Sequence, residues 1–216
     1  MGGPLDKLAT SQYDMHHITV LIMARTANTR KEDTHDHILE VAARALRREG
    51  YAGVRVADVM KEAGLTHGGF YAHFPSREAL LVEALARAGS ESAQVVARAV
   101  DPRRRKTASA FRSLIEAYLP DRHLATAETG CPVAALGSDM PRQSLALRQA
   151  SALRVARLIE TVRETLPGAP RSTATVVAGT MVGTLQLARA LGDNEEGHAV
   201  LAAARESLIL QYDKQA

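Results

Sequence analysis

The sequence predicts an all-α protein, with an N-terminal three-helix head that contains a helix-turn-helix and a C-terminal helical domain. Three observations favour this class. Ala, Leu and Arg, which favour helices, dominate the 216 residues, while Trp is absent and aromatic residues make up 4%. No sustained strand-like alternation of Val, Ile or Thr with polar residues occurs. Glycines, prolines and hydroxyl residues divide the chain into segments of helical periodicity.

The composition is that of a soluble globular protein, with 46% hydrophobic and 24% charged residues. A formal charge of +3 and a pI near 9.2 permit nucleic-acid binding without requiring it. The single cysteine, Cys131, excludes an intramolecular disulfide and fits a reducing cytoplasm. No stretch approaches the roughly 18 to 20 apolar residues that a membrane helix needs. These features predict a cytoplasmic protein.

Residues 1–29 are the least informative part of the chain. The apolar run at residues 18–22 is too short for a secretory core and lacks a typical cleavage site. We favour a poorly ordered extension here, with an additional helix or a natural start at Met23 as alternatives. Arg25, Arg30 and Lys31 could form a basic arm, although a merely soluble tail fits equally well.

Three helices are expected in the head. Thr34 can cap the first, which ends at Gly50, and the second covers residues 56–63 and stops at Gly64. Thr66 can cap the short third helix, and Ser76 the helix that follows. A helix, a glycine-containing turn and a second helix predict a helix-turn-helix. The apolar face of the first helix carries Ile38, Ala42, Ala45 and Leu46.

Several motifs in this head closely resemble the N-terminal signature of TetR-family transcriptional regulators. The resemblance covers about residues 30–84, and the spacing of so many matched positions makes it specific. It implies a DNA-binding domain at residues 30–77 and a helical effector-binding and dimerisation domain at residues 78–216. The matching motifs are Gly50-Tyr51, Val56-Ala57-Asp58-Val59, Ala63-Gly64-Leu65-Thr66, Gly68, Phe70-Tyr71 and His73-Phe74.

The N-terminal end of the second helix of a helix-turn-helix meets base edges in the major groove. Two successive glycines in so short a helix cost roughly 1 kcal/mol each against Ala, so close approach of the backbone to DNA, or a permissive helix cap, would explain them. The resemblance implies backbone contacts from Arg55, Tyr71, His73 and Arg77, whereas Phe70 and Phe74 are expected in the core. The predicted DNA-binding residues are Arg55, Thr66, His67, Gly68, Gly69, Tyr71, His73 and Arg77.

Six further segments are expected beyond the head. A connecting helix covers residues 78–100 and ends before Asp101-Pro102. The basic run at residues 103–106 is either a phosphate-binding patch or a solvated helix start. Helices are expected at residues 107–119, 144–166, 172–191 and 195–212, and a loop with a short helix at residues 129–137. The apolar face expected for residues 144–166 carries Leu145, Ala152, Val155, Ile159, Val162 and Leu166.

The last two helices carry the predicted dimer interface. Gly179 and Gly183 are four residues apart, which allows close helix approach, and the helix is apolar on more than one face. The resemblance implies a four-helix bundle with a second subunit, and a plain core helix is the alternative. The candidate interface residues are Val176, Gly179, Gly183, Leu187, Leu201 and Leu208.

The resemblance also implies a small-molecule effector that binds between the helices of the second domain. Cys131 stands apart from the other candidates, because it lies at an expected helix N-terminus, where a thiolate is favoured. It is interpreted as a sensor of oxidants or electrophiles, or as a small buried hydrophobic residue. The remaining candidates are Phe111, Ile115, Tyr118, Met140, Leu153 and Met181.

The sequence thus predicts a homodimeric repressor that leaves a palindromic operator when a small molecule or electrophile binds. An architectural DNA-binding protein without effector is the alternative, and a helical enzyme is a weaker one. No paired-His zinc motif, phosphate loop or Gly-x-Ser-x-Gly turn is present. His35 and His37 are two residues apart and do not share a helix face. No cofactor or metal is expected.

Overall fold

The computed structural model describes residues 6–104, 108–125 and 127–213, with side chains from Thr29 onward. The chain divides into two compact units, Met1–Ile38 and Leu39–Ala216. Within the described residues all regular structure is helical, which confirms the predicted fold class. Residues 39–77 of the proposed head lie in the same compact unit as the helical body, and the boundary at residues 77/78 stays a prediction.

Helix α1 covers Asp6–Gly53, with Gly50 in a non-helical conformation at φ 71°. Thr34 does not cap it, because the helix already runs through this residue and the Thr34 hydroxyl donates to the Arg30 carbonyl one turn back, at 2.8 Å. The backbone of residues 6–28 is part of this helix, which agrees with the additional helix named as an alternative, and a poorly ordered extension stays a prediction. The side chains of this segment, including that of Arg25, lie outside the described residues, and a basic arm stays a prediction.

The helix-turn-helix consists of α2 (Val56–Glu62) and the 3₁₀ helix η1 (His67–Ala72). Gly64 adopts φ 71° and closes α2 in a Schellman motif, in which the Leu65 amide donates to the Met60 carbonyl at 2.8 Å and the Gly64 amide to the Lys61 carbonyl at 3.0 Å. Thr66 occupies the cap position before η1, but its hydroxyl makes no capping bond, contrary to prediction. The recognition segment is therefore a six-residue 3₁₀ turn and not the expected α-helix.

Helix α3 (Arg77–Val100) connects this head to the rest of the second unit. The Ser76 hydroxyl accepts the Ala79 amide at 3.1 Å, which confirms the predicted cap. The helix ends at Val100, directly before Asp101-Pro102, as the proline requires. Its buried stripe is Leu80, Leu81, Ala84, Leu85, Ala88 and Val96.

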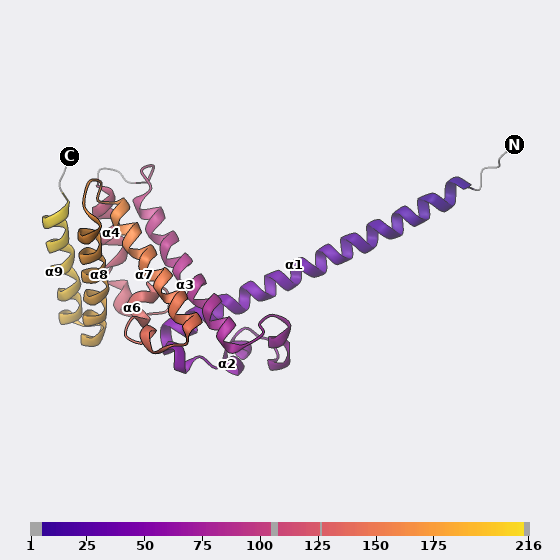
Figure 1. Ribbon diagram of the computed structural model, residues 1–216, viewed down its shortest axis with the longest axis horizontal. Coiled ribbons are helices and arrows are strands. Elements are labelled where there is room, and N and C mark those ends of the chain that lie inside the picture. The colour runs from indigo at the N-terminus through magenta and orange to yellow at the C-terminus, as the bar shows by residue number, and fades with distance from the viewer. Residues whose placement is uncertain (1–5, 105–107, 126, 214–216) are drawn as a thin grey trace. The chain divides into compact units, whose positions relative to one another are not determined.

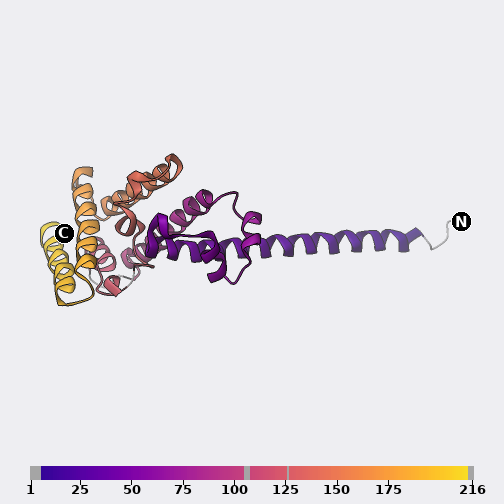
Figure 2. The ribbon, with the colours of Figure 1, turned by 90° about the horizontal axis from the view of Figure 1, so that it is seen from below.

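The remaining elements form a helical body around α3. They are α4 (Ala110–Tyr118), α5 (Arg122–Ala125), α6 (Pro132–Leu136), η2 (Met140–Arg142), α7 (Leu145–Glu164), α8 (Arg171–Leu191) and α9 (Glu195–Tyr212). Figures 1 and 2 show α8 and α9 side by side, and α7 packs against both α3 and α8. The four-residue α5 is not expected from the sequence. The helix predicted from residue 107 begins at Ala110, where Ser109 caps it by accepting the Arg112 amide at 2.9 Å.

The apolar face predicted for α7 is only partly correct. Val162 and the following Leu166 are buried, but Leu145 is 64% exposed and Val155 38% exposed. The helix is turned so that Ser151 faces inward, where its hydroxyl meets the Tyr51 hydroxyl at 3.2 Å and also donates to the Leu147 carbonyl. The inner face of α7 therefore combines the apolar Leu147 and Val162 with a polar contact between distant segments.

Helix α8 is the one described helix that is long and apolar enough to cross a membrane by length and composition, contrary to the sequence-based expectation. Its buried positions pack inside the helical body, against α7, α9 and α6. Thr184 and Met181 are both buried there, and Arg189 donates to the His123 carbonyl at 3.0 Å. These contacts are those of a core helix in a bundle.

Candidate nucleic-acid interface

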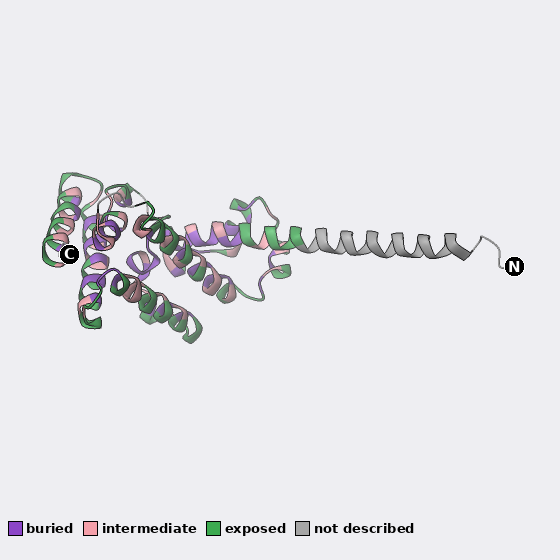
Figure 3. Cartoon of the chain, turned by 90° about the horizontal axis from the view of Figure 1, so that it is seen from above, coloured by how far each residue is buried: buried purple, intermediate pink, exposed green. Residues whose placement is uncertain are grey.

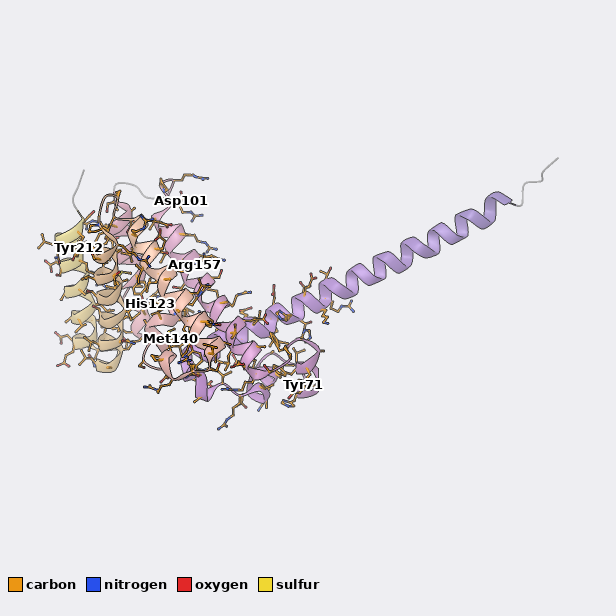
Figure 4. All side chains as sticks on the ribbon, in the orientation of Figure 1. Tyr71, Asp101, His123, Met140, Arg157 and Tyr212 are labelled. Atoms are coloured by element: carbon orange, nitrogen blue, oxygen red, sulfur yellow. The ribbon has the colours of Figure 1, made fainter. Side chains whose placement is uncertain are left out.

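The η1 segment holds two buried aromatic anchors and one exposed aromatic side chain. Phe70 and Phe74 are 1% and 0% exposed and their rings stack with centroids 5.6 Å apart, which confirms that both belong to the core. Tyr71 is 69% exposed and meets Phe70 edge-on at 5.2 Å (Figure 4). The anchors therefore fix η1 against the head, while Tyr71 points its phenol away from it.

Gly68 and Gly69 are not needed for the fold of this chain. Neither residue has a positive φ, so the backbone conformation does not require glycine. A Cβ on Gly68 would meet nothing within 4 Å, and one on Gly69 would make ordinary contacts of 3.7 and 3.8 Å with Thr66 and Met60. The bare backbone at this surface instead permits close approach by another molecule.

The other predicted contact residues surround this bare segment. Thr66 and His67 are exposed at the start of η1, and His73 is half-buried at its end. Arg55 is exposed at the cap position before α2. Its side chain makes no capping hydrogen bond, because arginine has no hydroxyl or carboxylate group to accept one. Cations and hydroxyl groups of this kind bind phosphate oxygens and base edges.

Arg77 has a structural task that the sequence does not reveal. Its Nε donates to the Val54 carbonyl at 2.9 Å, and another guanidinium nitrogen donates to the Tyr51 carbonyl. The side chain therefore ties the start of α3 to the corner between α1 and α2. Arg77 is exposed, so its positive charge is accessible to DNA, and the two carbonyls fix the position of its guanidinium.

Three further contacts, also unpredicted, join the end of α1 to the helical body. The buried Arg47 donates to the Glu91 carboxylate at 2.8 Å and to the Ala88 carbonyl at 3.3 Å. Arg48 pairs with Glu128 at 2.8 Å, and the contact between the Tyr51 and Ser151 hydroxyls is the third. Because the partners lie 41 to 100 residues apart in the sequence, no local pattern indicates them.

A cavity of about 370 Å³ opens between α3, α7 and the segment around Cys131. Of the predicted effector-binding residues it is lined by Tyr118 and Cys131. Phe111, Ile115, Met140 and Met181 are 0 to 6% exposed and do not line this cavity, so they are core residues there (Figure 4 labels Met140). Leu153 is 50% exposed and also absent from the lining.

Tyr118 and Cys131 belong to a buried polar cluster. Burial and, secondarily, the neighbouring Cys131 raise the pKa of Tyr118 well above its ordinary value. No nitrogen or oxygen of the described residues bonds to its hydroxyl, and the Cys131 thiol, a weak hydrogen-bonding group, lies beside it. His123 contacts the Tyr118 carbonyl through Nδ1 at 3.0 Å, and burial lowers the pKa of this imidazole. Cys131 is 6% exposed at the cap position before the five-residue α6, so both interpretations of this thiol remain open.

An exposed apolar strip runs along α8. Val176 and Leu187 are 58% and 64% exposed, and a Cβ on Gly179 or Gly183 between them would meet nothing within 4 Å. These four predicted interface residues therefore share one accessible face. Figure 3 shows that the helices of the body carry both buried and exposed residues. The predicted contribution of Leu201 and Leu208 from α9 is wrong, because they are 0% and 4% exposed inside the helical body.

Comparison with known proteins identifies this arrangement. The profile of "Bacterial regulatory proteins, tetR family" matches residues 38–84. Residues 38–84 of this chain therefore belong to the TetR family. The matched segment coincides with the helix-turn-helix and the start of α3, where the sequence resemblance was found.

Two characterised regulators support the same assignment of the TetR-family head. The chain is 34% identical over 61 residues to the HTH-type transcriptional regulator AcrR of Shigella flexneri, and 40% identical over 58 residues to CymR of Pseudomonas putida. The first match spans 28% of both chains, and the second spans 27% of this chain and 29% of CymR. Both relatives are transcriptional regulators and not enzymes.

Solved TetR-family structures match nearly the whole fold. A TetR transcriptional regulator from Chloroflexus aurantiacus J-10-FL matches with a TM-score of 0.70 and 20% identity, over 87% of this chain and 98% of that one. Reduced Escherichia coli NemR matches with a TM-score of 0.67 and 20% identity, over 82% and 95%. The helical body therefore has the same fold as these structures.

Proposed function

We propose that this TetR-family protein is a homodimeric, DNA-binding transcriptional repressor that acts in the cytoplasm. The observation that carries the proposal is the surface of η1. Tyr71 is exposed there beside Gly68 and Gly69, and the buried Phe70 and Phe74 hold this segment against the rest of the head. The buried phenylalanines fix the position of the segment, and the glycines leave room for DNA to approach its backbone closely. In helix-turn-helix proteins the corresponding helix enters the major groove.

The dimer is proposed from the strip on α8. Val176 and Leu187 expose apolar side chains on both sides of two glycines whose surface is open. A second copy of this strip would cover it by twofold symmetry, as in most soluble homo-oligomers. Two heads related in this way would recognise a palindrome with half-sites about 34 to 36 Å apart, or a multiple of this spacing.

Release by an effector is proposed from the cavity between α3 and α7. Its volume of about 370 Å³ lies in the range of small-molecule sites, about 300 to 1,000 Å³. An effector releases DNA when it binds more tightly to the conformation in which the two DNA-binding heads of the dimer are not spaced to fit the operator. Modification of Cys131 by an electrophile is a second route to release, supported by the position of this residue in the cavity lining.

Gly68→Ala tests the DNA interface with two measurements on one variant. Nothing lies within 4 Å of the added Cβ, and Ala is favoured over Gly in helices, so the free energy of unfolding should stay the same or rise. Affinity for operator DNA, chosen by selection from random sequences, should fall by about tenfold or more. Unchanged affinity would contradict the assigned interface, and selection without sequence preference would favour the architectural alternative.

Release is tested on the DNA-bound protein. Treatment with an electrophile should dissociate the native complex and leave the Cys131→Ser complex bound. Equal release of both proteins would exclude a sensing role for Cys131, and the cavity would then remain as the effector site.

A further inference from the structure

Two arginines line the cavity without a partner. Arg154 and Arg157 both lie on α7 in its lining, and no described side chain forms an ion pair or hydrogen bond with either guanidinium (Figure 4 labels Arg157). Paired arginines elsewhere on this surface include Arg87, which contacts Glu91 at 2.9 Å, and Arg163, which contacts Glu160. Arg154 and Arg157 differ from these two arginines in having no carboxylate partner among the described residues.

The surroundings of Arg154 disfavour its charge. Its side chain crosses α3 at Gly89, where a Cβ would lie 2.6 Å from the Arg154 Cδ. Partial burial, followed by repulsion from Arg157, lowers the pKa of Arg154. A partly desolvated cation beside a second cation gains stability when an anion binds between them.

The two carboxylates in the lining do not supply this anion. Glu160 accepts three hydrogen bonds from Arg163 at 2.5 to 3.0 Å, and Glu164 also interacts favourably with Arg163. Glu164 follows Arg154 by ten residues, which is about 15 Å along a helix. The acidic end of the wall is therefore balanced by Arg163, and the end with Arg154 and Arg157 is not.

The rest of the lining is apolar around one buried donor. Val96, Val133 and Leu158 contribute aliphatic side chains. The Tyr118 hydroxyl lies there beside the Cys131 thiol, a weak hydrogen-bonding group, and no nitrogen or oxygen of the described residues bonds to it. Tyr118 is only 3% exposed, so bulk water does not satisfy it. Buried polar groups are normally paired, and a ligand atom would complete this one.

We propose that the cavity binds an organic anion, a carboxylate or similar acid on an apolar skeleton. The acid group binds Arg154 and Arg157, the skeleton lies against the aliphatic residues, and a polar substituent reaches Tyr118. The inference rests on the proposed function in taking this cavity as the effector site. It adds the chemical class of the effector.

The test uses three probes with one skeleton: 2-naphthoate, 2-naphthylmethanol and 2-naphthylmethylammonium. Calorimetric titration of the full chain, without DNA and at constant ionic strength, should show naphthoate binding at least about tenfold more tightly than the alcohol, since ionic hydrogen bonds are the stronger ones. The ammonium probe should bind most weakly. Equal affinities for all three, or no binding of naphthoate, would overturn the proposal.

Variants then locate the site. Arg154→Gln combined with Arg157→Gln should abolish the preference for naphthoate over the alcohol, whereas Arg148→Gln, an exposed arginine on the same helix outside the lining, should preserve it. Gly89→Ala is a second variant, which keeps both positive charges and raises the helix propensity of α3. Its added Cβ displaces the Arg154 side chain, so the affinity for naphthoate should fall while the affinity for the alcohol stays the same. Preference retained in both variants would refute the assignment.

Measurement of DNA release separates this inference from the proposed function. Selective naphthoate binding without DNA release would uphold the anion site and contradict the effector role of the cavity. DNA release by the alcohol and the acid alike would uphold the effector role and contradict the anion site.

Discussion

Arg77→Lys separates the structural task of Arg77 from its charge. The arginine fork donates to two carbonyls, that of Val54 at 2.9 Å and that of Tyr51. A lysine keeps the positive charge at the same position, but its compact ammonium cannot span both acceptors with the geometry of a planar guanidinium. The variant therefore removes at least one charged hydrogen bond at the corner between α1 and α2.

The expected loss of stability follows from that bond. A hydrogen bond to a charged group contributes about 1.5 to 3 kcal/mol, and partial exposure of this site reduces the value to about 1 to 2 kcal/mol. For a chain of this size the melting temperature should fall by about 2 to 8 °C. DNA affinity should fall less than in Tyr71→Ala, because Arg77→Lys keeps its charge while Tyr71→Ala removes an exposed contact residue.

Urea unfolding and DNA titration at several salt concentrations measure the two effects. Arg55→Lys is the matched control, since Arg55 is exposed at a helix start and makes no cap, and its free energy of unfolding should change by less than about 0.5 kcal/mol. An Arg77→Lys protein with the unfolding midpoint of the native protein would refute the reasoning. So would equal destabilisation of both lysine variants.

Three further predictions concern the helical body and the head. Val176→Glu with Leu187→Glu should convert the proposed dimer to monomers in analytical ultracentrifugation, because the new charges would be buried without partners. Leu145→Glu, at an equally exposed site on α7, should leave the dimer intact. Burial lowers the pKa of His123 below its ordinary 6.5, so the unfolded chain binds this proton more readily than the folded chain. The free energy of unfolding should therefore fall as the pH drops below about 6.5, and it should fall less steeply in His123→Asn. Phe74→Ala should destabilise by about 3 to 5 kcal/mol in urea unfolding, and a loss below 1 kcal/mol would contradict its place in the core.

The head was predictable because its signals are local. Gly64 and Ser76 act on amides or carbonyls within a few residues, and both perform the predicted task. Thr34 fails for a related reason: a threonine hydroxyl can equally bond to the carbonyl one turn back, here that of Arg30, and so remain inside a helix. The residue type alone does not distinguish these two uses.

The helical body was less predictable because its polar contacts join distant segments. Ser151 faces inward and meets Tyr51, while Leu145 and Val155 of the expected apolar face are exposed. The sequence also could not show that Arg157 has no carboxylate partner. Glu160 is three residues from both Arg157 and Arg163 and could pair with either, but it bonds to Arg163. Leu201, on α9, is apolar at helical spacing, but spacing does not say whether such a face meets the same chain or a second one.

One turn of α3 connects the cavity to the head. Gly89 supports Arg154 in the cavity wall, while Ala88 and Glu91, on either side of it, accept hydrogen bonds from Arg47 at the end of α1. An anion that draws Arg154 away from Gly89 would change the packing of α3 within one residue of the Arg47 contact. Because Arg47 is 3% exposed and fixed to that turn, α1 must follow the movement or lose a buried ion pair. The proposed effector would therefore act on the head first through Arg47, and the Arg48–Glu128 and Tyr51–Ser151 contacts would resist or follow the same movement.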